Sequence, residues 1–173
     1  ARPVRTEILF NWIAQSDLVN PLDAADHAYY SLELIGPDGY EPESPNEQVV
    51  IGNILEHKSN VNGGRFTFRI GGDGTGYSDG RVWISNNVII LPSDMGVFDP
   101  IARLQVRMNS LYMRNNLFIR ADQLPSAMAG FRLFRQEAVW LTGTVKVYGE
   151  NNWYPPGTNI DTGTGLDAPS APA

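Results

Sequence analysis

Cysteine is absent from this chain of 173 residues, which excludes disulfide bonds, thiolate metal sites and cysteine nucleophiles. Lysine is scarce as well, because it occurs only at Lys58 and Lys146, and the only histidines are His27 and His57. Charged residues make up 18% of the chain against 42% hydrophobic residues, a low charge content for a soluble domain. We therefore expect a partner to cover part of the surface.

Long apolar runs are also missing. The longest, such as residues 88–91 and residues 8–13, which Asn11 interrupts, are much shorter than the roughly 20 residues that a membrane-spanning helix needs. The first ten residues contain two arginines, but the apolar run that follows soon reaches Asn11, which is not typical of a secretion signal. We expect no membrane span and no membrane partner.

The net charge of −6 is unevenly distributed along the chain. Residues 1–60 hold ten acids and three bases, a charge of −7, whereas residues 61–150 hold seven acids and ten bases, a charge of +3. Such a separation can orient neighbouring copies or partners, and scattered solvated charge is the alternative. The acidic balance and the lack of a lysine/arginine cluster argue against a nucleic-acid partner.

Period-two alternation is the main structural signal that the sequence does contain. In residues 139–147, Val139, Leu141, Val145 and Val147 alternate with Thr142, Thr144 and Lys146, which predicts a strand with one buried face. Residues 65–70 and 101–108 alternate in the same way, the second with arginines on its polar side. Further strands are expected at residues 4–13, 29–35, 48–55, 81–84, 88–91, 111–120 and 131–134; residues 111–120 also fit a helix.

These segments predict an all-β fold, a β-sandwich or β-barrel of short antiparallel strands. Turn residues favour hairpins at Ser85-Asn86-Asn87 and at Asn115-Asn116. No repeat of fixed period is evident. We expect one β domain over residues 1–150 and an extended arm over residues 151–173, where prolines and glycines replace the alternation.

Ser78 lies in Gly76-Tyr77-Ser78-Asp79-Gly80, which matches the nucleophile-elbow pattern of hydrolases. A working elbow needs a strand before the serine, a helix after it and, in that family's order, a downstream histidine. Glycines precede Ser78, a strand is predicted after it, and both histidines lie upstream. We therefore expect no hydrolase activity, although another chain order could still build a triad.

Metal and acid–base sites have equally weak signals. The loop 71–80 has one glycine/aspartate repeat, whereas calcium sites of that kind need stacked copies, so we expect at most incidental cation binding by Asp73 or Asp79. His27 and His57 lack a paired ligand pattern. Glu41 and Glu43 lie in a proline-rich loop that supplies no fixed separation for a glycosidase dyad. We expect no metal and no other cofactor.

Aromatic and arginine residues are the candidates for contacts with a partner. Trp83 and Trp140 lie inside apolar strands and are expected in the core, whereas a sugar-binding face could also use Trp12, Trp153 and the pair Tyr29-Tyr30. Arginines on or beside strands suit interfaces, because they pair with carboxylates and tolerate partial burial; a coding bias toward arginine is the alternative. The predicted interaction residues are Trp153, Tyr154, Pro155, Pro156, Ile160, Leu166, Arg103, Arg107 and Arg114.

In its organisation, a compact β domain with strands such as 65–70 and 139–147 and an arm at 151–173, the chain resembles bacteriophage head decoration or cement proteins. The resemblance implies a non-enzymatic structural protein of the virion that stabilises a shell by contacts with a major coat protein or with copies of itself. It implies no small-molecule substrate. A carbohydrate-binding β-sandwich module is the alternative that the aromatic residues support.

Overall fold

The computed structural model describes residues 5–14, 29–34, 46–56, 65–71, 80–91, 102–104, 110–120, 133–136, 146–155 and 158. In these residues the chain forms strands that group into three sheets, named A, B and C here. Sheet A contains β1 (Arg5–Leu9), β4 (Asn46–Ile51), β7 (Gly80–Ser85), β10 (Ser110–Arg114) and β13 (Lys146–Glu150). Sheet B contains β2 (Trp12–Ala14), β5 (Ile54–Glu56), β8 (Val88–Leu91) and β11 (Leu117–Arg120). Sheet C contains β3 (Tyr29–Leu34), β6 (Arg65–Ile70), β9 (Ala102–Leu104) and β12 (Phe134–Gln136).

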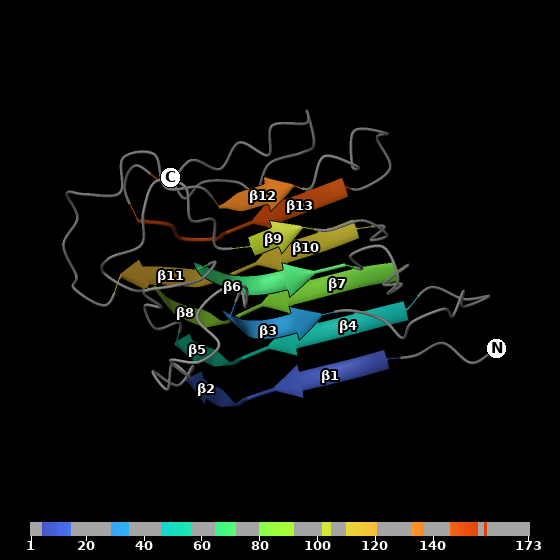
Figure 1. Cartoon of the computed structure of the whole chain (residues 1–173), viewed down its shortest axis with the longest axis horizontal. Helices are drawn as coiled ribbons and strands as arrows, with labels where there is room; N and C mark the ends of the chain where they lie inside the picture. Colours follow the sequence, from blue (N-terminus) through green and yellow to red (C-terminus); the bar gives the residue numbers. More distant parts are fainter. Residues whose placement is uncertain are drawn as a thin grey trace, which may run out of the picture.

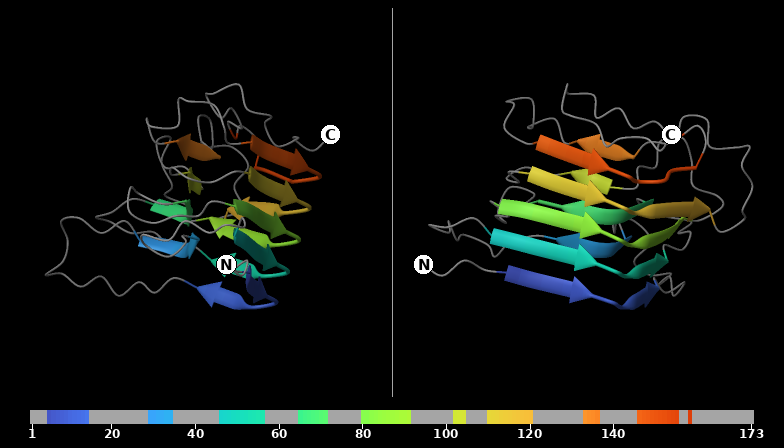
Figure 2. Two further views of the ribbon diagram at one scale, coloured as in Figure 1. Left: turned by 90° about the vertical axis from the view of Figure 1, so that its right-hand side faces the viewer. Right: turned by 180° about the vertical axis from the view of Figure 1, so that it is seen from behind.

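The three sheets are the sides of a parallel β-solenoid. The chain passes from sheet A to sheet B to sheet C and returns to sheet A one level higher, so each strand pairs in parallel with the strand three places later. Figure 1 shows β1, β4, β7, β10 and β13 stacked in this order, and Figure 2 shows the same stack from the side and from behind. One pass through the three sheets is called a coil below.

The prediction of an antiparallel β-sandwich or β-barrel is therefore wrong, because every pair of strands in the described part of the chain is parallel. The prediction of antiparallel pairing failed at the two segments that were expected to form hairpins. A two-residue type I′ hairpin needs a positive φ at both central residues, but at Ser85-Asn86-Asn87 only Asn86 has one, at 56°. The chain consequently turns a corner from β7 into β8 of another sheet. The Asn115-Asn116 segment joins β10 to β11 in the same way.

One left-handed residue marks this corner in every coil. The residues with positive φ at the A–B corners are Phe10, Gly52, Asn86, Asn115 and Asn151. Asparagine and glycine adopt this conformation at low cost, whereas phenylalanine does so rarely. Space also favours glycine at position 52, because a Cβ atom there would lie 2.5 Å from the ring of Phe10 in the preceding coil and this exposed side chain would have to move.

The core fills the inside of the solenoid along its length. Inward-facing side chains stack from coil to coil, so that Val50, Ile84 and Met113 form one column and Leu55, Ile89 and Phe118 another. All of these side chains are buried, and the stacking is what makes each coil depend on its neighbours. The strand predicted at residues 48–55 is thus two strands, β4 and β5, separated by the corner at Gly52.

Other predicted strands have mixed outcomes. The strand at residues 65–70 is confirmed as β6, and those at 29–35, 81–84 and 88–91 are confirmed in position by β3, β7 and β8. The segments 4–13 and 111–120 are each two strands in different sheets, β1 and β2 in the first and β10 and β11 in the second. The helix alternative for residues 111–120 is wrong. Of the segments 101–108, 131–134 and 139–147, the described residues cover only parts, in β9, β12 and β13.

Candidate interaction surface

Five stacked asparagines, called the asparagine ladder here, hold the A–B corners together. In each step the backbone N–H of one asparagine donates to Oδ1 of the asparagine in the next coil, as from Asn53 to Asn87 at 2.9 Å and from Asn87 to Asn116 at 3.1 Å. Side-chain amides also donate back to carbonyls of the preceding coil, as from Asn116 to Ile84 at 2.7 Å. The members of the ladder are Asn11, Asn53, Asn87, Asn116 and Asn152.

The ladder is buried over most of its length, since Asn53, Asn87, Asn116 and Asn152 are at most 1% exposed. Buried amides are tolerated only where their hydrogen bonds are made, and the inner members of the ladder bond to both neighbouring coils. The separations along the chain are 42, 34, 29 and 36 residues, so no fixed period exists. The structural repeat was missed for that reason.

A row of large apolar side chains, called the apolar ridge here, immediately follows the ladder. Each ladder asparagine is followed by an outward-facing residue of sheet B or its continuation, and these residues are in register from coil to coil. Neighbouring coils lie about 4.8 Å apart, so the five side chains span about 19 Å along the solenoid axis. The ridge consists of Trp12, Ile54, Val88, Leu117 and Trp153.

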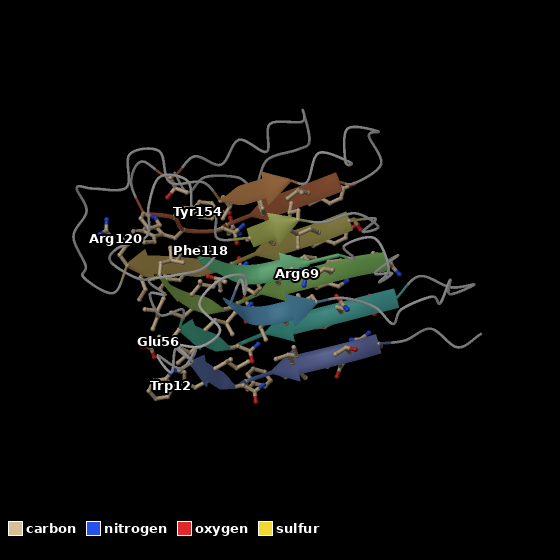
Figure 3. The ribbon with its side chains drawn as sticks, in the orientation of Figure 1. Trp12, Glu56, Arg69, Phe118, Arg120 and Tyr154 are labelled. Carbon is tan, nitrogen blue, oxygen red and sulfur yellow. The ribbon has the colours of Figure 1, made fainter. Side chains whose placement is uncertain are left out.

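The ridge is exposed although its side chains are apolar. Trp12 is 72% exposed, Trp153 44%, Ile54 40% and Leu117 38%. Figure 3 shows Trp12 at the outer corner of the first coil, pointing away from the body of the solenoid. Single exposed apolar residues are common, but a contiguous row of them marks an interaction surface.

The ridge is also rigid. The backbone N–H groups of Ile54, Val88, Leu117 and Trp153 donate to the carbonyls of ladder asparagines in the preceding coils at 2.8 to 2.9 Å. The second outward column of sheet B, beside the ridge, contains Ala14, Glu56, Ile90 and Ile119, and Glu56 is its one charged member. A partner therefore meets a fixed, mostly apolar strip with little hydrogen-bonding capacity, which is preorganised for contact.

An aromatic pair, Phe118 and Tyr154, lies in the core next to the ridge residues Leu117 and Trp153. Phe118 is fully buried and its ring centroid lies 5.0 Å from that of Tyr154; both are labelled in Figure 3. Burial raises the pKa of the Tyr154 hydroxyl above its ordinary value, and the neighbouring Asn152 side chain opposes this in part. The folded state therefore favours the neutral form of the Tyr154 hydroxyl.

Replacing Tyr154 with phenylalanine is expected to make stability less sensitive to alkaline pH. Because the folded-state pKa of Tyr154 is raised, its contribution to stability is present below the unfolded pKa of about 10 and is lost as pH rises above that value. The urea concentration at the midpoint of unfolding should therefore fall more between pH 8 and pH 10.5 for the wild-type chain than for Tyr154→Phe. Equal losses in the two proteins would contradict the buried, neutral state of this hydroxyl.

The predicted interaction residues lie in different environments. Trp153 is on the ridge, whereas Tyr154 and Pro155 are buried. Arg114 is exposed at the end of β10, where its Nε lies 3.2 Å from Glu150 Oε2, an exposed pair worth about 0–1 kcal/mol. Arg103 lies in β9. The other predicted residues, Pro156, Ile160, Leu166 and Arg107, lie outside the described residues.

Trp83 was expected in the core, and the structure instead places it on the outer face of sheet A. It stacks on Tyr112 with a centroid distance of 4.0 Å, and Tyr112 stacks on Tyr148 at 4.8 Å. The indole N–H of Trp83 donates to Glu47 Oε1 at 3.1 Å. The apolar run at residues 81–84 predicted the strand, but could not say which of its faces points inward.

The remaining candidate residues lie outside the part of the chain that the structure describes. These are Ser78, Asp73, Asp79, His27, His57, Glu41, Glu43 and Trp140. Among the described residues, no group of three or more histidine, aspartate or glutamate side chains could hold a metal ion. No helix in those residues is long and apolar enough to cross a membrane.

The ridge and the ladder were both missed at the sequence level, although a short pattern does mark them. Each corner has a left-handed residue, an asparagine and a large apolar residue in succession, as in Asn115-Asn116-Leu117. The other four are Phe10-Asn11-Trp12, Gly52-Asn53-Ile54, Asn86-Asn87-Val88 and Asn151-Asn152-Trp153. Comparison of the chain with protein-family models, with curated protein sequences and with solved structures gave no match.

Proposed function

We propose that this chain is a structural component of a larger protein assembly and that it docks on a partner protein through the apolar ridge. The observation that carries the proposal is the row of outward-facing apolar side chains held in register along one edge of the solenoid, of which Trp12, Ile54, Leu117 and Trp153 are exposed. Burial of such side chains against a partner supplies most of the favourable free energy of association.

The composition supports the same role. Charged residues make up only 18% of the chain, and the outer face of sheet B has few polar groups, as expected for the buried centre of a protein interface. The function proposed is that of a decoration or cement protein in a bacteriophage particle, with the major coat protein as its partner. The solenoid would act there as a short, stiff connector that adds contacts between coat subunits.

A double substitution in the middle of the ridge tests this role. The double variant Ile54→Lys/Leu117→Lys is expected to lose co-sedimentation with the particles. The measurement uses the tagged chain and particle fractions from cells that produce the bacteriophage. The physical reason is that two lysines would have to be desolvated in the contact. Both side chains face outward, so circular dichroism should show an unchanged fold. Arg81→Glu, an exposed change on sheet A, is the matched control and should sediment with the particles. A wild-type chain that stays in the supernatant would contradict the proposal.

A carbohydrate is the second candidate partner, because Trp12 and Trp153 are exposed at the two ends of the ridge and indole rings stack on sugar rings. Between them, however, the ridge is aliphatic, and sugar sites also need polar groups that fix the hydroxyls. A glycan array separates the two functions. Binding that is lost in Trp153→Ala but kept in the double lysine variant would favour the carbohydrate.

A further inference from the structure

The two ends of the solenoid differ in burial. In the first coil, Ile8 and Ile13 pack against the core cluster but are only partly buried, and Phe10 and Trp12 are exposed. In the last coil, the core-facing Val147 is fully buried, as is Leu133 of the coil before it, and Phe134 of that coil is 3% exposed. We call the β1 end the open end, because its core-facing side chains are less buried than those at the β13 end; β13 is likewise an edge strand of sheet A among the described residues. An open end leaves apolar surface and strand edges in water, which repeat proteins normally avoid by capping.

The free edge of β1 is the main feature of the open end. β1 pairs with β4 on one side, and in the described part of the chain no strand pairs with its other side. The carbonyl of Ile8 accepts from the side chain of Asn53, and the N–H of Phe10 donates to the carbonyl of Ile51, so these even-numbered residues direct their backbone groups toward the second coil. Backbone groups alternate in direction along a strand, hence those of Arg5, Glu7 and Leu9 point to the free edge.

β1 contains neither proline nor lysine, the residues that most often protect an edge strand from pairing. Its edge does carry charges of both signs, because Arg5 and Glu7 are 57% and 44% exposed and lie two residues apart. Within the chain, the Nε atom of Arg5 lies 2.6 Å from Glu7 Oε1, and its Nη1 atom lies 2.8 Å from Glu47 Oε2. These charges limit which strand, in which register, can pair with β1.

We propose that a second copy of this chain pairs with the open end, β1 against β1 in antiparallel orientation, with the two-fold axis at Thr6. In this register Arg5 of each copy lies opposite Glu7 of the other, and both are residues whose backbone groups point to the free edge. They can therefore form the hydrogen-bonded pairs of an antiparallel ladder. Opposite charges placed directly across from each other stabilise such pairs.

Other antiparallel registers lack this complementarity. An axis at Glu7 would place the two Glu7 carboxylates opposite each other, which is destabilising. An axis at Ile8 would place Glu7 opposite Leu9 and leave Arg5 unpaired across the interface. Parallel end-to-end stacking would pair β1 with β13 of a second copy, whose core-facing Val147 is already buried, so this contact would bury less apolar surface than two open ends do.

Pairing of β1 with β1 makes the assembly finite, because the contact is two-fold symmetric. It uses the β1 edge of both copies, so the product is a two-fold dimer rather than a filament. The dimer is independent of the docking role of the ridge. If that role holds, the dimer presents two ridges and can bridge two partner molecules.

Sedimentation velocity with charge-reversed variants tests the dimer and its register. The wild-type chain should sediment as a dimer. Arg5→Glu places a new carboxylate opposite Glu7 of the other copy, and Glu7→Arg places a new guanidinium opposite Arg5, so each variant alone should dimerise at least roughly tenfold more weakly. An equimolar mixture of the two variants should restore the dimer, because the two carboxylates of one variant then face the two guanidinium groups of the other. Loss of folding cannot produce such a rescue.

Two controls separate this interface from others. Arg114→Glu reverses an exposed charge of sheet A in β10 and should leave the dimer intact. The double lysine variant of the ridge should also remain dimeric, which distinguishes a failure of the dimer from a failure of ridge docking. A monomeric wild-type chain, a dimer that survives Arg5→Glu, or a mixture that stays monomeric while both variants are folded would each overturn the proposal.

Discussion

Replacing Asn116 with alanine is expected to lower the free energy of unfolding by about 3–5 kcal/mol. The side chain of Asn116 accepts from the N–H and the amide of Asn87, and it donates to the carbonyl of Ile84 and to Oδ1 of Asn152. Alanine would leave several of these buried groups without a partner, and each such group costs about 1–3 kcal/mol. Urea denaturation followed by circular dichroism measures the change.

Asn11→Ala is the matched control for this experiment. Asn11 occupies the same position in the first coil, but it is exposed, so water can replace the two bonds that its side chain makes to Leu9 and Asn53. Its loss should cost about 1 kcal/mol or less. If the two substitutions had equal effects, the ladder would not be the buried support that the structure indicates.

Replacing Phe118 with alanine is the second change with a large expected effect, about 3–5 kcal/mol of stability. Phe118 is fully buried between Ile89 of the coil below and Tyr154 of the coil above. The truncated side chain leaves a cavity that the backbone cannot close, because hydrogen bonds from Phe118 to Trp153 and from Trp153 to Asn116 hold the strands at fixed spacing. Urea denaturation measures this loss in the same way.

Leu117→Ala, the control for Phe118→Ala, shortens an apolar side chain at the adjacent position. Leu117 faces outward on the ridge and is 38% exposed, so its truncation should cost about 1 kcal/mol or less in the isolated chain. A loss as large as that of Phe118→Ala would mean that residues 117 and 118 do not point to opposite faces of β11.

Much of the strand content could be predicted from the sequence, and the β6 segment shows why. Residues 65–70 alternate polar and apolar side chains, and alternation depends on local geometry that a strand has in any sheet. Trp153 was set apart from the core residues because it lies beside prolines, outside the apolar strands, and its side chain is 44% exposed; its contact with a partner stays a prediction. These inferences needed no knowledge of which strands pair.

The pairing could not be predicted in the same way. A corner with one left-handed residue and a hairpin with two look alike in sequence, since both use asparagine and glycine, so Asn86-Asn87 was interpreted as a hairpin. Parallel pairing joins residues 29 to 42 positions apart at the ladder, and the variable separation removed the periodic signal by which a solenoid is usually found.

The sequence by itself determined that this chain forms short strands with alternating faces, and that it contains no cysteine chemistry. Only the tertiary structure decided that the strands stack in parallel, that five separated asparagines form one ladder, and that five separated apolar residues form one outward-facing ridge. The physical reason is that alternation and turn conformation are set by neighbouring residues, whereas register between coils is set by hydrogen bonds and packing between residues far apart in the chain.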